Sequence, residues 1–106
     1  GFGLAGPPTG PTAALIRLAN AGTAPVLAVD LPSGLDAATG EPFDPCVRAA
    51  RTLTLGLPKS GLLAPTARPL VGRLAVADIG IPPAAYAAIG VEAGPIFALG
   101  DPITIY

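Results

Sequence analysis

The sequence predicts an α/β fold with a mainly parallel sheet, and three observations support this prediction. Short runs rich in apolar residues, Val26–Val29, Arg51–Leu55 and Arg73–Ala77, are typical of strands. A helix or a long crossover segment separates each run from the next, as parallel strands require. The chain has 106 residues, the length of one small domain, and we find neither an internal repeat nor a second domain.

The first elements are a loop and a helix. Gly1–Pro11, with the sequence GFGLAGPPTGP, is predicted to be a loop because Gly and Pro interrupt it repeatedly. Thr12–Ala21 is predicted to be a helix, since Leu15, Leu18 and Ala19 share one face. The glycine that follows this segment is a suitable C-terminal stop.

Two predicted strands and two loops follow. Val26–Val29 is short and wholly apolar, so we expect a strand buried on both faces. Asp36–Pro45 contains turn-forming residues, and Arg51–Leu55 alternates as a strand does. Leu57–Pro69 is predicted to be a loop with one short helical turn.

The remaining elements are shorter. Arg73–Ala77 is predicted to be the third main strand. Pro82–Ile89 is predicted to be a short helix with a proline in its first turn. A small strand is expected around Pro95–Ala98.

Composition excludes several classes of function. Apolar residues make up 51% of the chain, charged residues only 12%, and the net charge is −1. No basic patch suggests a nucleic acid or an anionic membrane as partner, since the basic residues are scattered: Arg17, Arg48, Arg51, Lys59, Arg68 and Arg73. The absence of histidine removes His-based triads and most zinc sites.

Further features of composition bear on location and completeness. Cys46 is the only cysteine, so no intrachain disulfide is possible, and a small core residue in a cytoplasmic protein is expected. No apolar run has the length of a membrane span, and the first residues do not form a signal-peptide pattern. Because the chain starts inside a glycine-rich loop and without Met, we expect it to be a fragment.

Three charged residues follow the predicted strands and are expected at one edge of the sheet. Asp30 and Asp78 come directly after strands, and Lys59 lies four residues beyond Leu55. In parallel sheets, ligands bind outside the carboxyl ends of the strands. Asp30 is therefore either a turn-capping residue or a functional carboxylate.

Asp36, Asp78 and Lys59 are the other charged candidates. Asp36 is expected to form an Asx turn, and Asp78 to pair with Arg73 or to cap the Gly80 turn. Lys59, the only lysine, is either a solvated loop charge or a cation that reaches a ligand phosphate.

Two loops offer ligand-binding chemistry. In GFGLAGP, Gly1, Gly3 and Gly6 leave backbone amides that can approach a phosphate, although an ordinary turn has the same composition. In DLPSG, which runs from Asp30 to Gly34, Ser33 and the backbone carbonyls are hard oxygen donors suited to an alkali or alkaline-earth cation.

Four stretches, in this order, resemble one family. They are GFGLAGPPTGP, PVLAVDLPSGLDAATGEP, LTLGLPKSGLL and GRLAVADIGIP, which together extend from Gly1 to about Pro82. They resemble the NAD(P)H-hydrate epimerases, also called the YjeF N-terminal domain family. The resemblance implies a Rossmann-like three-layer α/β/α fold, of which residues 1–106 are the C-terminal portion, incomplete at the N-terminus.

The resemblance also implies an activity. Family members interconvert the R and S epimers of NADHX and NADPHX at C6 of the hydrated nicotinamide ring, for use by a companion dehydratase. They need no redox cofactor, hold K+ near the substrate and often form homodimers.

Site residues carry over by position. Asp30 matches the substrate-binding aspartate, and we expect it to act as the general acid/base with a pKa raised by desolvation. Ser33 matches a potassium ligand. The phosphate-binding loop corresponds to Gly1, Phe2, Gly3, Leu4, Ala5, Gly6 and Pro7. An Asn-Asn-Gly-Gly-Asp segment and a further aspartate, which complete the substrate and potassium sites in the family, are absent from this sequence.

Three other interpretations remain open. A non-enzymatic member of the same fold would bind RNA and protein partners. A different Rossmann-like protein would use Gly1–Pro7 to bind ordinary NAD. In the third interpretation, the chain is inactive by itself, because an incomplete sheet exposes strand edges and an apolar face.

Overall fold

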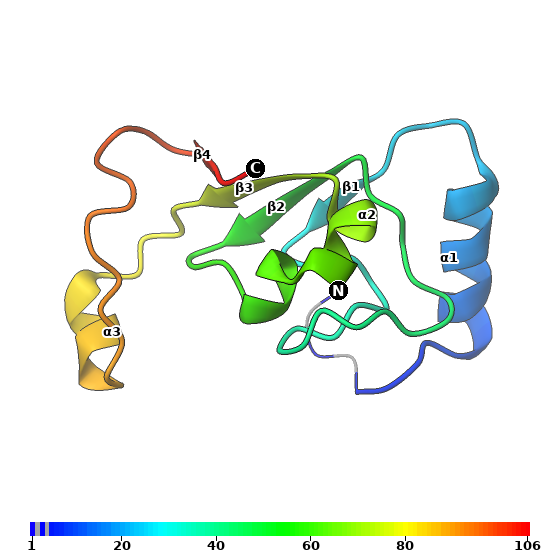
Figure 1. Ribbon diagram of the computed structural model, residues 1–106, viewed down its shortest axis with the longest axis horizontal. Coiled ribbons are helices and arrows are strands. Elements are labelled where there is room, and N and C mark those ends of the chain that lie inside the picture. The colour runs from blue at the N-terminus through cyan, green and yellow to red at the C-terminus, as the bar shows by residue number, and fades with distance from the viewer. Residues whose placement is uncertain (2, 4) are drawn as a thin grey trace.

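The computed structural model describes all residues except 2 and 4, and it confirms the predicted α/β fold with a mainly parallel sheet. Four strands lie in the order β1 (Leu27–Val29), β2 (Arg51–Leu55), β3 (Arg73–Ala77) and β4 (Ile103–Thr104) (Figure 1). The first three strands are parallel, and β4 is antiparallel to β3. The three strands predicted as the main ones are therefore confirmed.

The helices lie in three places along the chain. They are α1 (Gly10–Ala21), the consecutive short helices η1 (Ser60–Leu63), η2 (Pro65–Ala67) and α2 (Arg68–Val71), and α3 (Pro83–Ala88). The predicted helices at α1 and α3 are confirmed within two residues, and each has a proline in its first turn. The segment after β2 is more helical than the single turn that was expected.

The orientation of α1 differs from the expectation. Leu15 and Leu18 are 66% and 70% exposed, whereas Ala13 and Ile16 are buried. Asn20 explains the rotation, because it shares the face of the two buried residues and makes two tertiary hydrogen bonds. Its Nδ2 donates to the Cys46 carbonyl oxygen (2.8 Å), and its Oδ1 accepts from the backbone amide of Arg48 (2.9 Å).

One face of the sheet carries the core. The inward residues of the strands alternate with outward ones, and they pack with residues of the loop after β1 and of η1–α2. Thr52 is buried there, and its hydroxyl donates to the Val71 carbonyl oxygen (2.7 Å). The cluster consists of Leu31, Leu35, Cys46, Leu62, Ala67, Val71 and Leu74.

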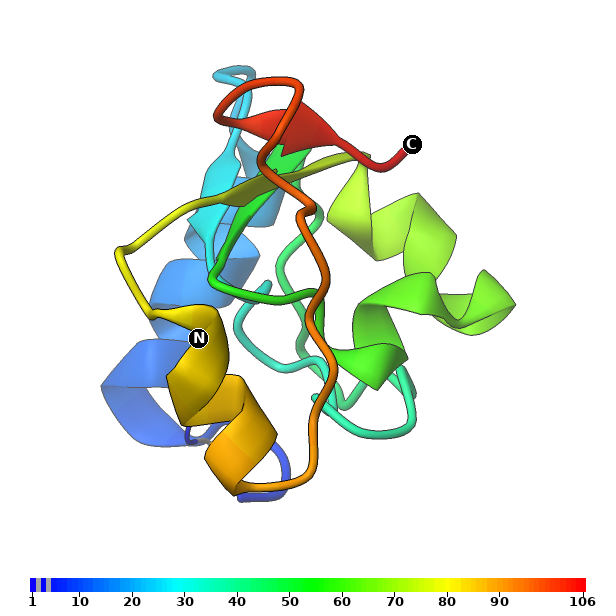
Figure 2. The ribbon, with the colours of Figure 1, turned by 90° about the vertical axis from the view of Figure 1, so that its left-hand side faces the viewer.

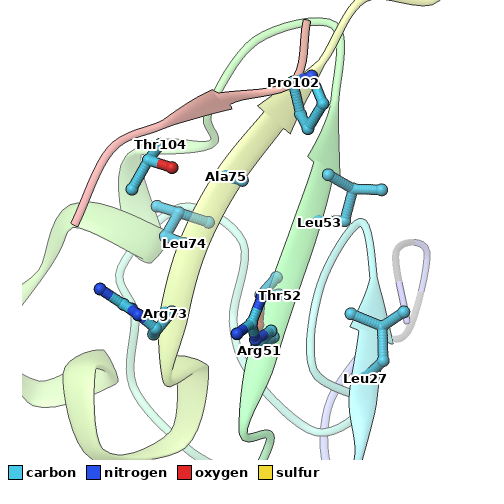
Figure 3. Close-up of a pocket in the computed structure, with 9 residues that line it drawn as sticks. All are labelled: Leu27, Arg51, Thr52, Leu53, Arg73, Leu74, Ala75, Pro102 and Thr104. Carbon is cyan, nitrogen blue, oxygen red and sulfur yellow. The ribbon is translucent and has the colours of Figure 1, made fainter.

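The opposite face of the sheet is open within the described part of the chain. Leu27 and Val29 are more than half exposed, so the expectation that β1 is buried on both faces is wrong. Figure 3 shows this face, where Leu27, Leu53 and Ala75 lie across three strands around a cavity of about 390 Å³. The sheet and one covering layer of the expected three-layer fold are therefore present here. The exposed apolar face expected for an incomplete sheet is also present.

The C-terminal strand lies later than expected. Segment 95–98 forms a turn closed by a bond from the Ala98 amide to the Pro95 carbonyl oxygen (3.1 Å), so the strand predicted there is wrong. Figure 1 places α3 beyond the carboxyl ends of the strands, and Figure 2 shows the chain running back from it to β4. There β4 pairs with Ala75 and Val76 of β3.

Candidate functional site

Asp30 directly follows β1 and has an unusual backbone conformation. Its φ is +70°, in the left-handed region that only Gly, Asn and Asp adopt with ease. Its amide still continues the sheet by donating to the Leu53 carbonyl oxygen at 2.8 Å. The combination turns the side chain at the strand end toward the end of β2, and a non-glycine residue in this uncommon conformation marks a candidate functional site.

Three donors converge on one oxygen of the Asp30 carboxylate. Oδ1 accepts hydrogen bonds from Lys59 Nζ at 2.5 Å, Thr54 Oγ1 at 3.1 Å and the Leu55 amide at 3.2 Å. The pair is partly buried, with the Lys59 and Asp30 side chains 23% and 18% exposed. Among the described residues none donates to Oδ2, so that oxygen is available to a ligand.

These contacts set the protonation state of the carboxyl group. Burial favours the neutral form, but the hydrogen bonds from Lys59, Leu55 and Thr54 and the charge of Lys59 outweigh it. The pKa of Asp30 therefore lies below its ordinary value of 3.8, and the expectation of a raised pKa is wrong. At neutral pH the group is a carboxylate, which can accept a proton.

The glycine-rich loop lies against the turn that follows Asp30. The Gly1 nitrogen donates to the carbonyl oxygens of Leu31 (2.6 Å) and Val29 (3.4 Å). A Cβ at Gly1 would stand 2.6 Å from Ser33 Cα and 2.7 Å from Ser33 Oγ, closer than atoms can approach. The structure thus brings the start of the predicted phosphate loop together with the predicted cation-binding turn.

The rest of that loop leads into the N-terminus of α1. Gly3 and Gly6 have φ of +93° and +83°, with open space where a Cβ would stand. Ala5 and Pro7 are exposed. The two other residues predicted to bind substrate here, Phe2 and Leu4, lie outside the described residues.

Most carbonyl oxygens of the DLPSG turn already accept hydrogen bonds. Pro32 accepts from the Leu35 amide at 3.1 Å, Ser33 from the Val47 amide at 2.9 Å, and the Gly34 carbonyl from a further amide at 2.8 Å. Ser33 Oγ has no hydrogen-bond partner in the described part of the chain. The turn is therefore tied into the fold by its carbonyls and offers a half-buried hydroxyl beside Gly1.

Two of the structural roles expected for acidic residues are confirmed. Asp36 forms the Asx turn, with Oδ1 accepting from the amides of Ala38 (2.9 Å) and Thr39 (2.8 Å). Asp78 caps its turn by accepting from the Gly80 amide at 2.8 Å. No hydrogen bond joins Asp78 to Asp30 among the described residues.

The predicted role of Cys46 as a core residue is also confirmed. The thiol is free and buried, and burial raises its pKa to about 11. A protonated, buried thiol is a poor nucleophile and a poor metal ligand.

The contacts of Lys59 and Thr54 were missed by sequence reasoning. Both interpretations of Lys59 left it unpaired within the chain, whereas it forms an ion pair with Asp30. Thr54 is fully buried at the end of β2, next to β1. The sequence RTLTL did contain a signal for the buried Thr54, because its alternation places threonines at the inward positions of a strand.

A cavity of about 220 Å³ lies at the same edge of the sheet. It is bordered by Gly56 and Leu57 after β2, Asp78 after β3 and Tyr86 of α3. Leu57 is two residues from Lys59, so this cavity adjoins the loop that carries the lysine. In the described ranges there is no cluster of metal-ligating acidic or cysteine side chains, and no helix there is long and apolar enough to cross a membrane.

Comparison with known proteins gives consistent matches. The family model described as YjeF-related protein N-terminus matches residues 1–61. The bifunctional NAD(P)H-hydrate repair enzyme Nnr of Moorella thermoacetica is 50% identical over 82 residues, covering 77% of this chain and 16% of that protein. The Nnr of Pyrobaculum aerophilum is 51% identical over 90 residues, which cover 85% of this chain and 18% of that enzyme.

A relative that is named only as an epimerase matches as well. The NAD(P)H-hydrate epimerase of Dehalogenimonas lykanthroporepellens is 45% identical over 92 residues, covering 87% of this chain and 36% of that enzyme. The chain thus spans little more than a third of the length of this relative and less than a fifth of the bifunctional ones.

Proposed function

The chain belongs to the YjeF-related N-terminal domain family, and we propose that it carries part of the active site of an NAD(P)H-hydrate epimerase. The observation that carries the proposal is the Asp30 carboxylate, ionised and held at the carboxyl end of β1 with Oδ2 available. Similarity to proteins named as epimerases supports the choice of reaction. We also propose that residues 1–106 are the C-terminal portion of a single domain.

The reaction inverts C6 of the hydrated nicotinamide ring, a carbon bonded both to a hydroxyl and to the ring nitrogen. Loss of hydroxide from C6 would need a proton donor, and an ionised carboxylate is not one. Asp30 instead favours ring opening. Its Oδ2 takes the hydroxyl proton, C6 becomes an aldehyde carbon, and the C6–N1 electron pair moves onto N1, where it is delocalised into the carboxamide.

Closure completes the inversion. Rotation about the C5–C6 bond presents the other face of the aldehyde to N1. Nitrogen adds to C6, the C6–N1 bond re-forms, and Asp30 returns its proton to the alkoxide oxygen. Atoms and charges balance over the cycle, and the carboxylate is regenerated.

Gly1–Pro7 is proposed to hold the phosphates of the substrate. Gly3 and Gly6 have left-handed backbone and no side chains, so amides there can approach an oxyanion closely. The loop runs into the N-terminus of α1, where free amides and the helix dipole favour negative charge. Holding the phosphates would fix the ring relative to Asp30.

We propose that this chain supplies only part of a potassium site, and that other parts of the protein supply the remaining oxygen donors. A hard cation needs about six oxygen donors, and in this turn most carbonyls already accept hydrogen bonds. Ser33 Oγ is the one hydroxyl that the turn offers. The residues present do not form a complete potassium site, and no step above depends on the ion.

The wider setting is also part of the proposal. A substrate of this kind and a free, unpaired cysteine suit a cytoplasmic enzyme. Two relatives are named as bifunctional NAD(P)H-hydrate repair enzymes, and we propose that a companion dehydratase uses the product. A homodimer is expected, and light scattering would determine it.

The test is epimerisation of purified (R)-NADHX, with a dehydratase specific for the S epimer as reporter. Two proteins should be assayed with potassium: this chain, and the Dehalogenimonas epimerase in which the chain replaces the matching residues. Activity in either supports the proposal, and activity only in the chimera assigns the remaining machinery to residues outside this chain. Inactivity of both, with a folded chimera and an active parent enzyme, refutes it. RNA binding by this chain would then favour the scaffold interpretation.

A further inference from the structure

We propose that Lys59 is a positioning residue that acts through Asp30, fixing one carboxylate oxygen so that the other faces the substrate. The inference rests on the proposed function, because it assigns a partner to the base of that reaction. It departs from both sequence-based interpretations of Lys59, neither of which linked it to Asp30.

The lysine ammonium is fully engaged inside the fold. An ammonium group has three N–H donors. Nζ of Lys59 contacts three acceptors, Asp30 Oδ1 at 2.5 Å, the Leu55 carbonyl oxygen at 2.9 Å and Thr54 Oγ1 at 3.3 Å. With all three donors in use, Lys59 has none left for a substrate phosphate.

The acceptors come from two adjacent parallel strands. Asp30 directly follows β1, Thr54 and Leu55 are the last residues of β2, and the two strands are paired in register from Leu27 to Val29. Lys59 therefore joins the two strand ends at the edge where the substrate is proposed to bind. Because both charged side chains are mostly buried, solvent screens their attraction less than it would at an open surface.

As a consequence, the two carboxylate oxygens of Asp30 have different roles. Oδ1 receives a side-chain cation, a hydroxyl and an amide, which fix the plane and position of the carboxylate. Oδ2 is then held in one orientation for the reacting hydroxyl. Without Lys59, Asp30 would keep only two neutral donors and could rotate or take up a proton more easily.

The experiment compares four variants in the active form identified above. Lys59→Met removes the charge and keeps the aliphatic stem, Lys59→Arg keeps the charge, and Thr54→Val removes a neutral donor of the same site. Arg17→Met is the matched control, since it removes an exposed cation from α1. Within the described residues the charged groups beside Asp30 are Lys59 and the amino group of Gly1, and the state of Gly1 is the same in every variant of a given protein.

A positioning role predicts a loss in kcat and only a small change in KM. We expect Lys59→Met to lower kcat by about tenfold or more, with KM within about threefold of the parent value. The acid limb of its pH profile should move to higher pH, because removing the cation raises the pKa of Asp30. Lys59→Arg should recover part of kcat. A rise in KM at unchanged kcat would instead make Lys59 a substrate-binding residue and overturn the proposal.

A second measurement is independent of activity. The Asp30 carboxyl carbon can be titrated by NMR in the chain and in Lys59→Met, with Arg17→Met as control. A higher Asp30 pKa in Lys59→Met alone supports the pairing, and equal values in all three proteins refute it. If neither the chain nor the chimera epimerises the substrate, the proposed function fails, and so does the effect of Lys59 on turnover. The titration still decides whether Lys59 holds Asp30.

Discussion

Replacing Gly34 by alanine tests whether the turn behind Asp30 depends on close backbone packing. Gly34 has a φ of +96°, and a Cβ there would overlap the Pro45 carbonyl oxygen and stand 2.8 Å from Cys46 Cα. Both neighbours are backbone atoms, so no side chain can rotate away. Alanine at this position would have to displace either the DLPSG turn or segment 45–46.

The cost can be worked from two contributions. A left-handed backbone costs a non-glycine residue about 1–2 kcal/mol, and forcing atoms into packed space adds about 1–3 kcal/mol. Gly34→Ala should therefore lower the free energy of unfolding by about 2–5 kcal/mol, against a total of about 5–15 kcal/mol for a typical domain. The melting temperature should fall by about 10 °C or more.

Gly80→Ala is the matched control. Gly80 has a φ of +79°, but nothing lies within 4 Å of where its Cβ would stand. This substitution should cost only the conformational contribution, about 1–2 kcal/mol. Thermal and urea unfolding followed by circular dichroism measure both variants. If Gly34→Ala destabilises the protein no more than Gly80→Ala, the close approach of the turn to segment 45–46 is refuted.

Three further predictions concern charge and reactivity. Asp30→Asn keeps a residue that tolerates positive φ but removes the base and the ion pair with Lys59. Turnover should fall about 10²-fold at a temperature where the variant is still folded, and the melting temperature should fall as well; near-normal turnover of the folded variant would instead indicate a structural role. The pKa values of Asp30 and Asp36 lie below 3.8, the second through bonds from the Thr39 and Ala38 amides. These carboxylates therefore stabilise the fold above about pH 4, and this stabilisation should be lost as the pH falls below that value and through their folded pKa values. In urea melts, Asp36→Asn should lose less free energy of unfolding on acidification than the parent chain does. Cys46, with a pKa of about 11, should react with Ellman's reagent at pH 8 only after unfolding; rapid labelling of the native chain would contradict its burial.

The fold was largely predictable because its strands have strong local signals. Arg51–Leu55 and Arg73–Ala77 alternate clearly, and both strands have the predicted bounds. The rotation of α1 was not predictable, since Leu15 and Leu18 form the more apolar face. Two long-range hydrogen bonds of Asn20 decide the orientation, and no pattern within the helix reveals partners 26 and 28 residues away.

The position of the site could be predicted from the sequence, but the contacts between its residues could not. The rule that parallel strands bring their carboxyl ends together placed Asp30 and Lys59 at one edge. The direct ion pair, and its effect on pKa, required the register between β1 and β2. The expectation of a raised Asp30 pKa considered burial alone, whereas the three donors on Oδ1 outweigh burial and lower the pKa.

The reversed pKa has a chemical consequence that reaches beyond this residue. A carboxylic acid at Asp30 could have protonated a leaving hydroxide, so either bond at C6 of the proposed substrate could have broken. A carboxylate stabilised by Lys59, Thr54 and the Leu55 amide can begin only by removing a proton. In the proposed reaction, the same three contacts that hold the side chain at the end of the strand would favour ring opening over loss of hydroxide. Under this proposal, the hydrogen bonds that fix the geometry of Asp30 also determine which bond at C6 breaks.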